Sequence, residues 1–211
     1  MRKLLLFVWL LLPAAALAYH YGPGQDQVRI DRAADAVTRA DQFAREARAL
    51  AADQGDEAAR GLWASAEQAY TEALEALPKD SLGADRVLRL ERAKAQMFLS
   101  KLPDAHRDLT VLVEELSEDP SAGAELLADA RGALANAQYY RTWLMRLEGA
   151  PAEEWEPEIE ASRQNYKLLA EQAQESGDVL LAKASAENLE SSIRLARMDL
   201  DDLQGLPLPS Q

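Results

Sequence analysis

Alanine and leucine dominate this chain: together they supply 74 of its 211 residues, whereas isoleucine, valine and threonine together supply 14. Alanine and leucine favour helices, while strands draw mainly on β-branched and aromatic residues. Hydrophobic residues make up 48% of the chain, so it can bury a core. The composition therefore predicts an all-α fold and argues against an all-β or a βαβ fold.

The first eighteen residues have the three parts of a secretory signal peptide. Arg2 and Lys3 are basic, residues 4–12 form an unbroken apolar run, and Ala16, Leu17 and Ala18 form a small-x-small cleavage site. The apolar run is shorter than the ~20 residues of a membrane-spanning helix, and no other run reaches that length. We therefore expect cleavage rather than a retained anchor, a periplasmic or secreted protein, and no membrane insertion after cleavage.

Proline, glycine and capping residues divide the rest of the chain into about seven helices. Pro103 suits the first turn of a helix, Gly149 suits a left-handed helix end, and Asp178 suits the N-cap of the last helix. The predicted organisation is a signal peptide at 1–18, a flexible lead at 19–26, one helical domain at 27–203 and a disordered tail at 204–211.

The last predicted helix carries a heptad-like apolar seam. Its members are Ala182, Ala186, Leu189, Ile193, Ala196, Leu200 and Leu203. Such a seam either packs on the preceding helical hairpin or forms a dimer. Lasting coiled coils use larger residues at both seam positions, so the alanines favour packing within the chain, and we expect a monomer rather than a dimer.

One stretch has the residue pattern of a helical repeat, with small and aromatic residues alternating before a proline. Its members are Gly61, Trp63, Ala66, Tyr70, Ala73 and Pro78. The stretch resembles the second helix of a tetratricopeptide repeat, and residues 100–112 are a looser second copy. Residues 134–139 resemble a first helix. The resemblance implies stacked antiparallel hairpins that form an α-solenoid, and the alternative is a compact helical bundle.

The sequence lacks the motifs of the common enzyme classes: there is no HExxH, GxSxG, GxxxxGK[ST] or CxxC. Its two histidines, His20 and His106, are far apart in the sequence, so we expect no metal site, no cofactor and a surface position for His106. We predict that the protein is not an enzyme. Two alternatives remain: a cell-wall-associated enzyme or accessory domain that uses paired carboxylates, and a structural helical oligomer.

The chain is strongly acidic, with 36 acidic and 23 basic residues and a formal net charge of −13. This charge argues against nucleic acid and anionic lipid as partners, because both are bound through lysine and arginine. A basic protein or peptide partner is compatible with it.

The resemblance also implies a place for a partner to dock. In peptide-binding tetratricopeptide proteins the first helix of each repeat lines a concave groove. Carried over to this sequence, that lining includes Lys94 and Met97 in one repeat and Asn136 and Tyr139 in the next. Tyrosine, tryptophan and arginine are frequent interface anchors, although aromatic residues at helical spacing are also typical of a core. The candidate groove residues are Lys94, Met97, Asn136, Tyr139, Tyr140, Arg141 and Arg146.

Overall fold

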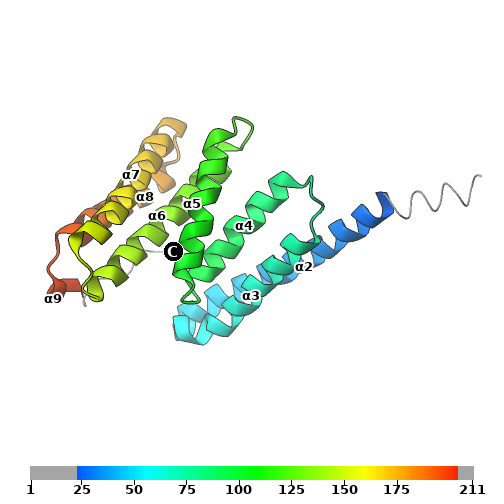
Figure 1. Ribbon diagram of the computed structural model, residues 1–211, viewed down its shortest axis with the longest axis horizontal. Helices are drawn as coiled ribbons and strands as arrows, with labels where there is room; N and C mark the ends of the chain where they lie inside the picture. Colours follow the sequence, from blue (N-terminus) through cyan, green and yellow to red (C-terminus); the bar gives the residue numbers. More distant parts are fainter. Residues whose placement is uncertain (1–22, 204–211) are drawn as a thin grey trace, which may run out of the picture.

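The computed structural model describes residues 23–203 of the chain, and no strand is found in that range. The helices are α2 (Pro23–Gln54), α3 (Asp56–Ala76), α4 (Leu82–Met97), α5 (Leu102–Glu118), α6 (Ala124–Leu147), α7 (Ala152–Ser176), α8 (Val179–Arg197) and α9 (Leu200–Leu203). Three antiparallel hairpins, α2–α3, α4–α5 and α6–α7, stand side by side, and α8 lies against α7 (Figure 1). This arrangement confirms the predicted all-α stack of helical hairpins.

Each helix packs mainly on the helices that precede and follow it in the sequence. The first helices of the second and third hairpins, α4 and α6, also contact each other, and α6 contacts α8. Contacts limited to near neighbours are typical of a solenoid, whereas a compact bundle brings distant helices together. One side of the stack is therefore built from α4, α6 and α8.

Several predicted segments fall wholly or partly outside the described residues. The predicted signal peptide at 1–18, the first part of the predicted lead and the predicted tail at 204–211 are among them. Residues 23–26 are described, and they form the start of α2 rather than a flexible lead. Among the helices of residues 23–203, none is long and apolar enough to cross a membrane.

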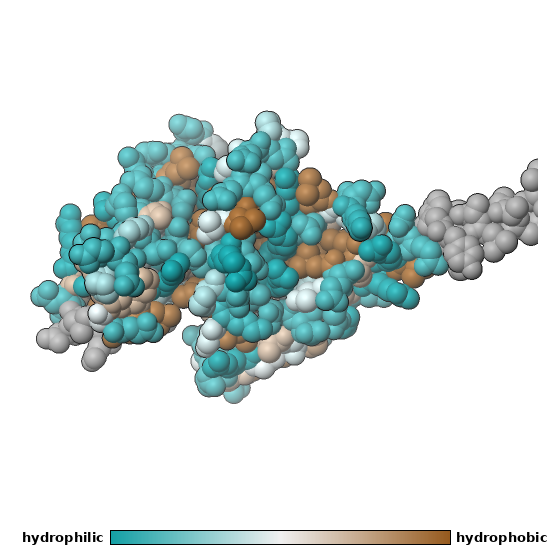
Figure 2. All heavy atoms as spheres, viewed as in Figure 1, coloured by the Kyte–Doolittle hydropathy of each residue, from teal (hydrophilic) through white to brown (hydrophobic). Residues whose placement is uncertain are grey.

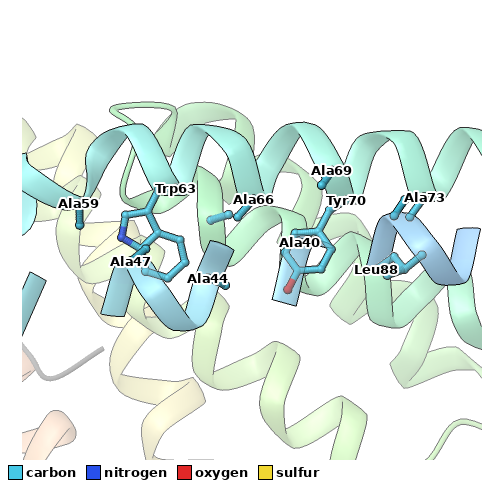
Figure 3. Packing of buried hydrophobic residues seen from close by; sticks show 12 residues of the cluster. Ala40, Ala44, Ala47, Ala59, Trp63, Ala66, Ala69, Tyr70, Ala73 and Leu88 are labelled. Atoms are coloured by element: carbon cyan, nitrogen blue, oxygen red, sulfur yellow. The ribbon is translucent and has the colours of Figure 1, made fainter. Parts of the chain in front are cut away.

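The first hairpin is held by two aromatic rings that face a row of alanines. Trp63 and Tyr70 extend from α3 toward α2, and each is 2% exposed (Figure 3). The buried residues opposite them on α2 are Ala36, Ala40, Ala44 and Ala47. Because alanine side chains are small, the two helices approach closely and the rings fill the space between them. Both aromatic residues of the repeat-like stretch are therefore core residues.

Two further contacts anchor these rings. The Trp63 ring stacks on Phe98 with a centroid distance of 4.0 Å, which ties α3 to the residue that follows α4. The Tyr70 hydroxyl donates a hydrogen bond of 2.8 Å to the Asp41 carboxylate on α2. Burial and this bond raise the pKa of Tyr70, so its hydroxyl stays protonated and keeps donating.

The second hairpin combines a leucine core with a row of ion pairs. Leu109, Leu112 and Leu116 of α5 are at most 1% exposed. Three arginines of α4 each pair with a carboxylate on or just after α5. The pairs are Arg86–Asp119 at 2.6 Å, Arg89–Glu115 at 2.7 Å and Arg92–Asp108 at 2.9 Å. Hydrophilic side chains cover most of the face shown in Figure 2.

One of these pairs predicts a pH-dependent contribution to stability. Hydrogen bonds from Ser121 and from Arg86 lower the pKa of the Asp119 carboxyl from 3.8 to about 2. Because the pKa is lower in the folded protein, the stabilisation is complete above about pH 4 and is lost as the pH falls toward 2. We expect Asp119→Asn to lower the urea midpoint at pH 7, with the difference from wild type shrinking between pH 4 and pH 2.

The control for this experiment is Glu118→Gln, which changes an exposed neighbouring carboxylate with no ion pair among the described residues. It should leave the midpoint nearly unchanged at every pH. If Asp119→Asn is equally destabilising at pH 7 and at pH 2, the carboxylate charge is not the source of the effect.

Candidate functional site

A cavity of about 940 Å³ lies at the end of the third hairpin, where α6 and α8 begin and α7 ends. Arg48 of α2 and residues at the end of α4 complete its lining. Its walls are mainly apolar, and the large side chains among them are Met97, Phe98, Leu127, Leu169 and Leu181. The volume is within the range of ligand-binding sites, which are mostly apolar with a few polar groups.

The cavity exists because small residues face one another across three helices. Ala124, Ala128 and Gly132 repeat at intervals of four on α6 and so lie on one side of it. Ala173 of α7 and Ala184 of α8 line the same cavity. A Cβ atom added at Gly132 would lie 3.8 Å from Leu169 Cδ1, an ordinary contact distance, so this wall has room for a larger side chain.

Uncharged polar side chains also line the cavity. The Tyr166 hydroxyl donates a hydrogen bond to Asn136 Oδ1, which leaves the Asn136 amide nitrogen without a partner among the described residues. Burial raises the pKa of Tyr166, so the phenol keeps its proton. The Ser185 hydroxyl and the Asn188 side-chain amide also line the cavity, and neither forms a hydrogen bond within residues 23–203.

The charged groups around the cavity are partly neutralised. Lys94 Nζ lies 2.9 Å from Glu91 and 2.8 Å from Asp129. Burial would lower the pKa of Lys94, but these two carboxylates outweigh it and raise the pKa, so the ammonium group stays charged. Arg48 lies 5.5 Å above the Trp63 ring and, like Glu125, has no ion pair in the described part of the chain.

Three of the seven candidate groove residues line this cavity: Lys94, Met97 and Asn136. The other four candidates do not. Tyr139 is 2% exposed and lies in a core cluster with Ile159 and Leu195.

The remaining three candidates make contacts within the protein. Tyr140 packs edge-on against Tyr139, with a centroid distance of 5.9 Å. Arg146 donates hydrogen bonds to the backbone oxygens of Leu195 and Met198 at the end of α8. Arg141 pairs with Glu158 at 2.9 Å. These side chains hold α6, α7 and α8 together instead of facing the cavity.

We expected His106 to lie at the surface. Its side chain is instead largely buried, with 16% of its area exposed. Its Nε2 lies 3.0 Å from Glu158, and its Nδ1 lies 3.3 Å from Arg141. Hydrogen bonding to His106 is the main reason that the pKa of Glu158 is lowered. This cluster joins α5 to the third hairpin. Within the described residues, no group of three or more histidine, aspartate or glutamate side chains is placed to hold a metal ion.

No protein-family model, curated protein or solved structure matches the chain. The class of the protein is defined by its fold and its cavity. It is an all-α stack of helical hairpins with a mainly apolar cavity between its third hairpin and its last long helix.

Proposed function

We propose that this protein is a non-enzymatic, tetratricopeptide-like interaction module that docks a segment of a partner protein in the cavity between α6, α7 and α8. The observation that carries the proposal is the cavity itself. It has the volume and the apolar walls of a binding site, and it opens beside exposed apolar residues at the start of α8. The predicted signal peptide further indicates that the protein binds its partner in the periplasm or outside the cell.

The position of the cavity in the stack supports docking of a chain segment. Stacked helical hairpins create an extended surface along which a partner segment can lie. In this protein, α4, α6 and α8 meet along one side of the stack, and all three contribute lining residues. Lys94, Met97 and Asn136, on α4 and α6, are where the tetratricopeptide resemblance expects a ligand.

The proposal predicts that filling the cavity removes partner binding. Ala184 is exposed and lines the cavity, so Ala184→Trp places a large side chain in the cavity without disturbing the core. We expect this variant to lose about tenfold or more in affinity for partners, a cost of about 1.4 kcal/mol. The measurement is capture of proteins from cell-envelope extracts on the immobilised protein, followed by titration of each captured protein.

The matched control is Ala186→Trp, which adds the same side chain at an exposed position of α8 outside the cavity lining. It should capture the same proteins as wild type. Equal capture by the two tryptophan variants would contradict the proposed docking site.

A further inference from the structure

We propose that the docked segment carries one large apolar side chain, which inserts between α7 and α8, and a neighbouring lysine or arginine, which pairs with carboxylates at the rim. This inference rests on the proposed docking function and specifies the chemistry of the partner.

The apolar side chain is indicated by the residues on both sides of the opening. Leu169 of α7 is buried at the back of the cavity, and Leu181 of α8 lines it while remaining 39% exposed. Two further aliphatic residues precede Leu181: Val179 is 76% exposed and Leu180 is 82% exposed. Three consecutive aliphatic residues in the first turn of a helix expose apolar surface that a partner would remove from water.

The polar groups inside the cavity indicate that the ligand is a peptide rather than a hydrocarbon. The Ser185 hydroxyl lines the cavity and forms no hydrogen bond with another described residue. The Asn136 amide nitrogen and the Asn188 side chain offer further donors and an acceptor in the same cavity. Polar groups that lose water need hydrogen-bond partners. A peptide main chain brings both donors and acceptors, whereas a hydrocarbon brings neither.

The charge at the rim selects a basic neighbour. Glu125 in the first turn of α6 and Asp178 at the N-cap of α8 both line the end of the cavity where these helices begin. Each carboxylate carries a full negative charge, which exceeds the partial positive charge of about one half at a helix N-terminus. The ammonium group of Lys94 is already paired with Glu91 and Asp129. The two carboxylates therefore make the end where α6 and α8 begin acidic, whereas Arg48 adds a positive charge to the lining from α2, over the Trp63 ring. The chain as a whole is also negative.

The test is selection of a random dodecapeptide library, displayed on phage, against the purified protein. We expect the enriched peptides to share one large apolar residue with a lysine or arginine within two positions of it. Synthetic copies should bind wild type and Ala186→Trp equally and lose about tenfold or more in affinity for Ala184→Trp.

A charge-matched pair of variants tests the basic residue. Glu125 and Glu153 are exposed glutamates in the first turns of α6 and α7, neither has an ion pair among the described residues, and Glu125 alone lines the cavity. Glu125→Gln should lower the affinity for the enriched peptides about threefold or more and reduce the salt dependence of their binding, because one charge–charge attraction is lost. Glu153→Gln should change neither.

The outcomes separate this inference from the proposed function. Enriched peptides that need an open cavity but share no apolar residue, or carry acidic neighbours, would overturn the inference and leave the docking function standing. An equal effect of the Glu125 and Glu153 variants would contradict the proposal that the partner carries a basic residue at the rim. No enrichment, or peptides that bind Ala184→Trp as well as wild type, would overturn both.

Discussion

Trp63→Ala is expected to lower the free energy of unfolding by about 3–5 kcal/mol, the usual cost of removing a buried aromatic ring. The Trp63 ring fills the space between α2 and α3 and stacks on Phe98, so its loss leaves a cavity where three helices meet. The alanines opposite it are too small to occupy that space. Urea unfolding followed by circular dichroism measures the effect.

Trp63→Phe is the informative control for this prediction. The smaller ring can keep the stacking on Phe98, and the substitution removes the indole nitrogen, which is buried without a hydrogen-bond partner in the described residues. We expect this variant to lose less than about 1.5 kcal/mol, because removing an unsatisfied donor offsets part of the lost packing. Trp63→Ala with a loss below about 1 kcal/mol would contradict the packing of the first hairpin.

Arg146→Ala is expected to cost about 2–4 kcal/mol, although Arg146 was a candidate for the groove. Its buried guanidinium donates hydrogen bonds to the last carbonyls of α8 and lies 4.7 Å above the Trp155 ring. A cation at a helix C-terminus is also favoured by the helix dipole. Hydrogen exchange should show the largest loss of protection in the second half of α8, while urea unfolding reports the total cost.

Two variants separate the roles of Arg146. Arg146→Met keeps much of the aliphatic packing and loses the hydrogen bonds, so it should be intermediate between wild type and Arg146→Ala. Arg194→Ala removes an exposed arginine of α8 that pairs with Glu190, and it should cost at most about 0.5 kcal/mol. Equal effects of Arg146→Ala and Arg194→Ala would contradict the role of Arg146 as a cap of α8.

The helices could be predicted because their limits are set by local chemistry. Gly149 follows α6 with a φ of 75°, the left-handed conformation that glycine adopts most easily. Asp178 accepts a hydrogen bond of 3.0 Å from the backbone nitrogen of Leu181 at the start of α8. The burial of Trp63 and Tyr70 could also be predicted, because large aromatic residues among alanines on one helix face need a packed environment.

The side of α6 that faces the cavity could be predicted only in part. Asn136 lines the cavity, whereas Tyr139, three residues further along, lies in a core with Leu195. The division between these two sides depends on where α8 packs against α6, a contact between residues about fifty positions apart in the sequence. No local pattern encodes that contact.

The most buried face of α8 lies one position before its apolar seam, and the seam residues Leu189 and Ala196 are partly buried against core clusters of the third hairpin. Ser185, Ser192 and Leu195 are buried, whereas the seam residue Ala186 is exposed. Serines pack this face of α8 against the third hairpin. Ser162 Oγ of α7 lies 3.3 Å from Ser192 Oγ of α8 and donates a hydrogen bond of 2.9 Å to the backbone oxygen of Ala135 on α6. A hydrophobic pattern does not count serine as a core residue, so it could not identify this face.

Site-specific photo-crosslinking tests the central claim, that the cavity is where a partner docks. A benzophenone amino acid replaces Leu180, which is 82% exposed beside the cavity and outside its lining, or Ala186, which is exposed further along α8, and the purified protein is irradiated in envelope extracts. We expect a discrete crosslinked protein from position 180 and none from position 186. Crosslinking from position 186 alone, or from neither position, would contradict the docking role of the cavity.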